Sequence, residues 1–287
     1  MPIERAFVAG AGLMGHGIAQ VLAAAGRTVE LYEPDLERAV AGRDRIAGNL
    51  GRAVAKGRLA ADERDAILAR VRPTADGAAV GVADAVIEAI YEDLAVKRRF
   101  WSDVDRQARP DAILASNTSS ISIDSLAAVV APARRPRFVG MHFFSPVPVM
   151  PLVELVRGSE TSDETADAVR ALSADLGKQV IVSADRPGFI VNRMLMPFLV
   201  EAMRVLEEGV ATAEDIDMGA KIGLNHPMGP LELADFIGLD VCRNIMAVLA
   251  EGIGGPQFEA PQVLVDLVEA GHLGRKTGRG FHEYPPV

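Results

Sequence analysis

Gly10-Ala11-Gly12-Leu13-Met14-Gly15 follows a short apolar run, Ile3–Ala9, and opens a helical pattern, Met14–Ala25. The first glycine allows a tight turn, the second lets a pyrophosphate approach the backbone, and the third lets helix and strand pack closely. The N–H groups and the positive dipole end of such a helix attract phosphates. The stretch therefore predicts a parallel βαβ unit that binds a dinucleotide. The predicted cofactor-binding residues here are Gly10, Gly12, Leu13, Met14 and Gly15.

An acid closes the second predicted strand, Thr28–Tyr32. Glu33 follows Gly15 by 18 positions, close to the spacing of about 20 residues at which an acid binds the adenosine ribose. Because a carboxylate there repels a 2′-phosphate, Glu33 predicts NAD rather than NADP. Arg38 lies a few residues further on, and its positive charge favours NADP instead. An ordinary βα turn followed by a surface acid is the alternative interpretation.

The chain outside this loop divides into two parts of different character. As far as residue 185, short apolar runs alternate with longer helical patterns, which is typical of an α/β fold with parallel strands. The further strands are predicted at Asp84–Glu88, Ala112–Ala115, Phe138–Met141, Val153–Val156 and Gln179–Val182. The further helices are predicted at Leu36–Lys56, Asp62–Arg70, Glu92–Ala108 and Thr165–Leu176.

Beyond Asp185-Arg186-Pro187-Gly188 only helical patterns remain. They are Phe189–Glu208, Ala213–Ile222, Leu231–Ala250 and Pro261–Ala270. The sequence therefore predicts a Rossmann-type NAD-binding domain at residues 1–185 and an all-helical substrate and dimerisation domain at residues 186–287.

Composition excludes several classes of function. The 287 residues are 24% charged and 49% hydrophobic, as in an ordinary globular protein. A net charge of −9 disfavours nucleic acid and anionic membrane surfaces as partners. The single cysteine, Cys242, excludes an internal disulfide and a multi-cysteine metal site, and we expect no metal. No apolar run approaches the ~20 residues of a membrane helix, and residues 1–7 lack an export signal, so we expect a cytoplasmic protein.

A nicotinamide enzyme needs a side chain that moves the proton while the cofactor moves the hydride. None of the three tyrosines has a lysine four positions later, which excludes the Tyr-x-x-x-Lys arrangement of short-chain dehydrogenases. His142 follows the apolar run Phe138–Met141. It is therefore expected at the C-terminal edge of a parallel strand, where open α/β sheets bind ligands. The other histidines are predicted to be a helix filler, a turn residue and two surface residues: His16, His226, and His272 with His282.

Glu154 lies twelve residues after His142, within the apolar run Pro151–Val156. A carboxylate with such neighbours is expected to be buried, and a buried carboxylate needs a cationic or hydrogen-bonded partner. His142 would supply that partner, and the pair would orient the imidazole for general acid–base catalysis. A core histidine with an unrelated acid fits the same two residues.

The sequence resembles the 3-hydroxyacyl-CoA dehydrogenase family, especially its bacterial 3-hydroxybutyryl-CoA members, over essentially the whole chain. The segments that carry the resemblance are Gly10–Gln20, Ala115–Ser120, Met141–Pro148, Pro187–Arg193 and Gly274–Phe281. The resemblance implies that His142 is the catalytic base and Glu154 its partner. It implies that Ser119 and Asn192 bind the 3-oxygen of the substrate and neighbouring groups. It also implies a homodimer.

The resemblance further implies contacts to both ligands. The NAD contacts are Glu92, Lys97, Ser119, Ser145 and Lys276, and the thioester contacts are Asn49 and Lys56. Without the resemblance, Glu92 reads as a helix-start acid and Lys97 as a solvated helix-face charge. Ser145 stands where the family usually has asparagine, and Asn49 where it has a small hydroxyl residue. We therefore expect retained activity with an altered pocket.

The resemblance implies an NAD-dependent enzyme of fatty acid metabolism that interconverts a short-chain 3-hydroxyacyl-CoA and its 3-keto form. Three alternatives stay open. The first is the same chemistry on an acyl group carried by an acyl carrier protein, as in the synthesis of polyketide extender units. The second is oxidation of a free polyhydroxy acid such as gulonate. The third is a non-catalytic NAD-binding protein, against which the intact His142, Glu154, Ser119 and Asn192 argue.

Overall fold

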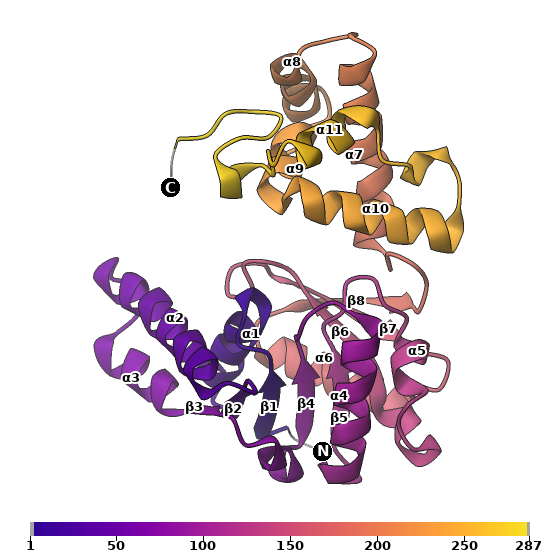
Figure 1. Ribbon diagram of the computed structural model, residues 1–287. Helices are drawn as coiled ribbons and strands as arrows, with labels where there is room; N and C mark the ends of the chain where they lie inside the picture. Colours follow the sequence, from indigo (N-terminus) through magenta and orange to yellow (C-terminus); the bar gives the residue numbers. More distant parts are fainter. Residues whose placement is uncertain (1–2, 286–287) are drawn as a thin grey trace. The chain divides into compact units, whose positions relative to one another are not determined.

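The computed structural model describes residues 3–285, and its first unit, Met1–Arg186, is built on one sheet. The strands are β1 (Arg5–Ala9), β2 (Thr28–Tyr32), β3 (Val71–Thr74), β4 (Ala85–Glu88), β5 (Ile113–Ser116), β6 (Phe138–Phe143), β7 (Leu152–Arg157) and β8 (Gln179–Ala184). Their order across the sheet is β3-β2-β1-β4-β5-β6-β7-β8 (Figure 1). All neighbouring strands run parallel except β6 and β7, which are antiparallel.

The helices of this unit connect and cover the strands. They are α1 (Leu13–Ala24), α2 (Leu36–Ala55), α3 (Ala61–Ala69), α4 (Leu94–Gln107), α5 (Ile123–Ala127) and α6 (Asp163–Asp175), with short 3₁₀ turns η1 (Gly77–Val82) and η2 (Pro132–Arg137). The Rossmann-type fold predicted from the sequence is confirmed. Two elements were not predicted. Strand β3 is short, lies at the sheet edge and contains Pro73, a residue that edge strands tolerate, and α5 has only five residues.

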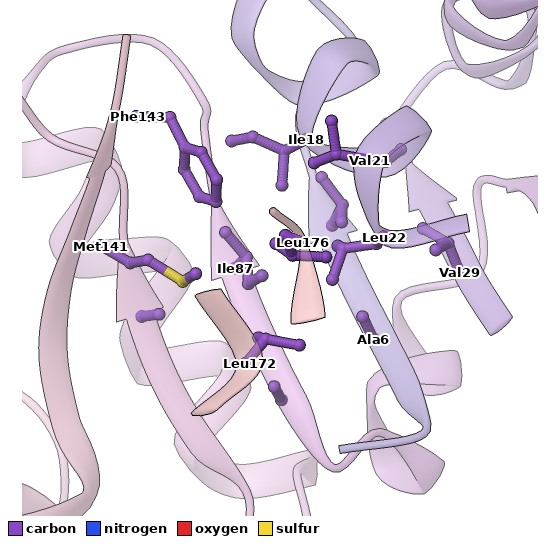
Figure 2. Packing of buried hydrophobic residues seen from close by; sticks show 14 of the residues in the cluster. Ala6, Ile18, Val21, Leu22, Val29, Ile87, Met141, Phe143, Leu172 and Leu176 are labelled. Carbon is purple, nitrogen blue, oxygen red and sulfur yellow. The ribbon is translucent and has the colours of Figure 1, made fainter. Parts of the chain in front are cut away.

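Alternate residues of each strand point to opposite faces of the sheet. The positions of Met141 and Phe143 on β6 join a core with Ile87 of β4, Leu22 of α1 and the helix α6 (Figure 2). The intervening positions face the other side, where Phe138 of β6 packs edge-on against Trp101 of α4 at 4.7 Å between ring centroids. His142 has the same parity as Phe138, so its side chain belongs to the α4 face of the sheet.

The second unit, Pro187–Val287, is helical, as predicted. Its helices are α7 (Val191–Glu207), α8 (Ala213–Met218), α9 (Pro230–Ile237), α10 (Leu239–Ile253) and α11 (Gln262–Glu269), with the short turns η3 (Gly219–Gly223), η4 (Pro256–Phe258) and η5 (Arg275–Thr277). The prediction of one helix over Leu231–Ala250 was wrong. Gly238 has φ of 104°, a conformation that glycine adopts readily, and it divides that stretch into α9 and α10.

The core of this unit joins all five helices. Leu199 and Met203 of α7, Leu231 of α9 and Met246 of α10 are fully buried in it. Over residues 3–285, no helix is long and apolar enough to cross a bilayer.

Candidate active site

The glycine loop lies between β1 and α1, at the carboxyl end of the first strand. Gly10 has φ of 96°, and a Cβ there would stand 2.4 Å from the carbonyl oxygen of Ala89. A Cβ on Gly15 would stand 1.7 Å from the carbonyl oxygen of Gly10. The structure therefore requires glycine at both positions for packing alone.

Gly12 has a different role, because its position is open. Among the described residues, nothing lies within 4 Å of the place where a Cβ on Gly12 would stand. The helix α1 begins at the next residue, Leu13, and the N–H groups in the first turn of a helix have no partner within the helix. This open backbone beside a helix N-terminus fits the pyrophosphate of a dinucleotide.

Glu33 closes the turn after β2. Its Oε1 accepts a hydrogen bond of 2.7 Å from the backbone N–H of Ala11, and the residue is half-buried. The carboxylate therefore lies beside the glycine loop, where the prediction of a ribose-binding acid requires it.

His142 and Glu154 occupy opposed positions on β6 and β7. The Nδ1 of His142 lies 2.7 Å from Oε2 of Glu154. The His142 residue is 4% exposed and Glu154 is 0% exposed. Since a carboxylate only accepts hydrogen bonds, Nδ1 carries the hydrogen and Nε2 of the neutral ring keeps its lone pair. His142 lies near the C-terminal end of a strand parallel to β5, as expected, but within the strand and not after it, because β6 continues to Phe143. On its other side β6 is antiparallel to β7.

Ser119 meets the other nitrogen of the same ring. Its Oγ lies 3.0 Å from Nε2 of His142. It belongs to the loop that follows β5, the strand next to β6. The structure thus aligns Glu154 of β7, His142 of β6 and Ser119 of the loop after β5.

Asn117 was not identified from the sequence. Its Oδ1 accepts a hydrogen bond of 2.8 Å from the backbone N–H of Phe143, the residue next to His142. It therefore ties the end of β6 to the loop that carries Ser119. Its place in the Ala115–Ser120 motif, directly after a buried strand, was the available signal.

Glu92 binds the loop that carries Ser119. Its Oε1 accepts hydrogen bonds from the hydroxyl of Thr118 at 2.5 Å and from the backbone N–H of Ser119 at 2.9 Å. Its Oε2 lies 3.0 Å from the ammonium of Lys97. Burial opposes the ionised form of Glu92, but Lys97 and these hydrogen bonds outweigh it and hold the pKa below the ordinary glutamate value.

Lys97 is buried, so its interpretation as a solvated helix-face charge was wrong. The side chain is 1% exposed, and its ammonium also pairs with Glu88, which is 0% exposed. Glu88 was not identified from the sequence. An acid at the end of the apolar run Ala85–Glu88 was the same signal that identified Glu154.

The predicted thioester contacts Asn49 and Lys56 line one pocket of about 450 Å³ in the first unit. Leu13 of the glycine loop, Arg52 of α2 and the segment Pro146–Val149 line it as well. Asn49 donates a hydrogen bond of 3.1 Å to Oε1 of Gln20 and accepts one of 2.5 Å from Arg52. The pocket thus gathers cationic side chains in a chain of net charge −9.

A buried lysine fixes the segment that closes this pocket. The ammonium of Lys178 donates hydrogen bonds to the carbonyl oxygens of Val147 and Met150, at 2.6 and 2.8 Å. Burial lowers the pKa of this ammonium. Ser145 precedes the segment and is exposed.

Two predicted site residues belong to the second unit. Asn192 is the second residue of α7. Lys276 lies in η5, with its ammonium 2.5 Å from Oδ1 of Asp240. Their predicted places beside substrate and NAD remain predictions.

The remaining histidines have structural surroundings. Nδ1 of His16 lies 2.6 Å from the carbonyl oxygen of Gly12, and the ring of His226 packs on Phe198 at 5.0 Å. The prediction that His282 is a surface residue was wrong, since its Nε2 lies 2.7 Å from Oδ2 of Asp217 and its side chain is mostly buried. Within the described part of the chain, no group of three or more His, Cys, Asp or Glu side chains is placed to hold a metal ion.

Comparison with known proteins identifies the family. Residues 5–186 match the model of the 3-hydroxyacyl-CoA dehydrogenase NAD-binding domain, and residues 188–284 match that of the C-terminal domain. The 3-hydroxybutyryl-CoA dehydrogenase of Bradyrhizobium diazoefficiens is 48% identical over 282 residues, which are 98% of this chain and 96% of that protein.

Solved structures agree over the same length. The crystal structure of FadB2 from M. tuberculosis is 46% identical, with a TM-score of 0.96, and the match covers 99% of this chain and 100% of that one. The (S)-3-hydroxybutyryl-CoA dehydrogenase PaaH1 of Ralstonia eutropha is 44% identical, with a TM-score of 0.94 and coverage of 99% and 100%. The chain therefore belongs to the 3-hydroxyacyl-CoA dehydrogenase family, NAD-dependent oxidoreductases whose two characteristic domains it contains in order.

Proposed function

We propose that the protein interconverts a short-chain 3-hydroxyacyl-CoA and its 3-ketoacyl-CoA, with His142 and Glu154 as the acid–base pair. The observation that carries this proposal is the line of contacts from Glu154 through His142 to Ser119, at 2.7 and 3.0 Å. Such a line activates one ring nitrogen and orients it from the other side. It stands on the same sheet as the glycine loop, so proton and hydride transfer share one scaffold.

The residues present fit NAD, because the backbone at Gly12 is open and Glu33 lies beside the loop. Bound NAD supplies the hydride acceptor in the oxidation direction. Nε2 of His142 takes the hydroxyl proton of the substrate, and the Glu154 carboxylate stabilises the resulting imidazolium. In reduction, the protonated ring returns that proton to the oxygen, while Ser119 and Asn192 stabilise its developing charge.

We propose that NAD has further contacts, as the sequence predicts. They are Glu92, Lys97, Ser145 and Lys276. Serine at position 145 donates one hydrogen bond where asparagine donates two, so this side chain contributes less to holding the cofactor than the usual residue.

A CoA thioester is the substrate class that the first unit favours. Lys56 and Arg52 line the pocket that opens beside the glycine loop, and cations bind the phosphates of a nucleotide. The B. diazoefficiens and R. eutropha relatives are named as 3-hydroxybutyryl-CoA dehydrogenases. Four carbons is therefore the acyl length we propose.

NADH oxidation with acetoacetyl-CoA tests the proposal directly. We expect rapid turnover with acetoacetyl-CoA, and slower turnover when the same acyl group is presented on an acyl carrier protein. In the reverse direction, (S)-3-hydroxybutyryl-CoA should be oxidised and its enantiomer should not. Turnover of the carrier-bound substrate alone would move the enzyme to synthesis on a protein-tethered chain, and no turnover of either would refute the activity.

We further propose that Pro187–Val287 is the substrate and dimerisation unit. Several large apolar side chains of its helices are exposed, among them Met218, Ile222, Leu224 and Phe236. Apolar surface that is contiguous marks an interaction site, and we propose that a second copy of the chain covers these side chains. Light scattering coupled to gel filtration should give the mass of a dimer, and Ile222→Lys should reduce it; a monomeric wild type would refute the dimer.

A further inference from the structure

A buried ionic pair lies outside the proposed line of contacts from Glu154 through His142 to Ser119. Glu88 ends β4 and Lys97 lies in the first turn of α4. Their side chains are 0% and 1% exposed, and the two are directly paired. Removing two charges from water is costly, so such a pair persists only where further hydrogen bonds satisfy it.

Both oxygens of the Glu88 carboxylate accept hydrogen bonds. Its Oε1 accepts from the backbone N–H of Ile90 at 3.0 Å, as well as from Lys97. Its Oε2 accepts from the hydroxyl of Ser116 at 2.7 Å. Glu88 therefore fixes the ammonium of Lys97 between the ends of β4 and β5.

The ammonium has one further partner, and that partner reaches the surface. Lys97 lies 3.0 Å from Oε2 of Glu92, whose side chain is 39% exposed. A ligand that approaches this edge of the sheet meets the Glu92 carboxylate rather than the buried ammonium.

The other oxygen of Glu92 shapes the loop that carries Ser119. It accepts from the Thr118 hydroxyl, from the N–H of Ser119, and from the N–H and hydroxyl of Ser120, the last two at 3.3 and 3.1 Å. All of these groups donate, so they favour the ionised form of the carboxylate. The charged groups around Glu92 are Lys97 on α4 and Glu88 on β4; the neighbouring Asp93 carboxylate accepts instead from the N–H of Val96.

We infer that Glu88 and Lys97 are positioning residues, which act through an ionised Glu92 to fix the loop that holds Ser119 against His142. Lys97, predicted from the sequence as an NAD contact, also holds Glu92 in its ionised form. The expected effect on turnover rests on the proposed function. The expected effect on the loop that carries Ser119 does not.

The test compares three variants. Lys97→Met removes the ammonium and leaves Glu88 buried without a counter-charge, which strongly destabilises a fold. The double variant Glu88→Gln/Lys97→Met removes both buried charges and restores folding, while Glu92 still lacks its cation. Arg99→Met, at an exposed position of the same helix, is the matched control.

Hydrogen exchange of the amides of Ser119 and Ser120, measured against pH in the protein without ligands, reports whether these amides keep their hydrogen bonds to Glu92. In the double variant we expect these amides to lose protection at a higher pH than in the wild type, because Glu92 protonates more easily without Lys97. The acid limb of the kcat/KM profile should move to higher pH in the same way. The value of kcat/KM at neutral pH should fall by up to about 100-fold, as expected for a misplaced catalytic group, with a smaller effect on NADH binding.

Each outcome decides one question. Equal protection of Ser119 and Ser120 in the folded double variant, the Arg99→Met control and the wild type would overturn the inference. A loss of NADH binding as large as the loss of turnover would also overturn it, because the variant would then act through the cofactor site and not through the loop. If the wild type turns over no 3-ketoacyl thioester, the proposed function fails, while the exchange measurement still decides whether Lys97 and Glu88 position the loop.

Discussion

His142 and Glu154 face each other across the antiparallel pair β6 and β7, with Nδ1 and Oε2 2.7 Å apart. The backbone ladder of two strands therefore sets this distance, rather than the conformation of a loop. A slip of one residue in register would turn Glu154 toward the apolar core. The proposed acid–base pair is thus as rigid as the sheet that carries it.

Loss of the imidazole should separate turnover from cofactor binding. His142→Gln removes the proton acceptor, so we expect kcat to fall by about 10²–10⁴-fold, the usual contribution of a general base. NADH affinity, measured by fluorescence titration, should stay near the wild-type value. His272→Gln is a control at a histidine of the second unit. Unchanged turnover in His142→Gln would remove His142 from the mechanism.

The glycine loop offers a matched pair of alanine variants. Gly15→Ala places a Cβ against the carbonyl oxygen of Gly10, so it should destabilise the fold by about 1–3 kcal/mol or more. Gly12→Ala meets open space in the described structure, so the melting temperature should be unchanged while NADH affinity falls. Melting curves with and without NADH make the comparison. Full NADH affinity in Gly12→Ala would show that the pyrophosphate does not approach this position.

Glu33 should determine the choice between the two nicotinamide cofactors. Glu33→Gln keeps a hydrogen-bond acceptor for the N–H of Ala11 but removes the charge that repels a 2′-phosphate. The ratio of kcat/KM for NAD to that for NADP should therefore decrease, by about tenfold if the lost discrimination is near 1.4 kcal/mol. A ratio equal to that of the wild type would exclude Glu33 as the ribose-binding acid.

The lowered pKa of Glu92 predicts a pH dependence of stability. Burial opposes ionisation, but Lys97 and the hydrogen bonds from the loop outweigh it, so the pKa in the folded state lies below that in the unfolded state. The carboxylate therefore contributes stability above the ordinary glutamate pKa, and this contribution is lost as pH falls through the lowered value. Melting temperatures should decrease less steeply in acid for Glu92→Gln than for the wild type. Parallel curves would contradict the assignment.

Lys56 should recognise the nucleotide part of the thioester. We expect Lys56→Met to raise KM for acetoacetyl-CoA by about fivefold, since an exposed ion pair contributes up to about 1 kcal/mol. The N-acetylcysteamine thioester of the same acyl group lacks the nucleotide, so its KM should not change. Equal effects on both substrates would place Lys56 near the acyl group instead.

Local patterns were sufficient for much of the fold and the site. The glycines of the loop and the apolar context of Glu154 depend on neighbouring residues, so the sequence alone predicted the βαβ unit and a buried acid. The direction of β7 did not follow from them, because an apolar run of six residues reads the same in a parallel or an antiparallel strand. The pairing of Glu88 with Lys97 did not follow from local patterns either, since the two residues belong to different elements.

The segment between β6 and β7 combines two independent properties. Its ends belong to strands that hold His142 against Glu154, while its middle, Pro146–Val149, lines the pocket beside Lys56. Lys178 fastens that middle at the carbonyl oxygens of Val147 and Met150, whatever side chains those residues carry. Evolution can therefore exchange the side chains of this segment and alter which thioester is accepted. The pairing of His142 with Glu154 is inherited unchanged.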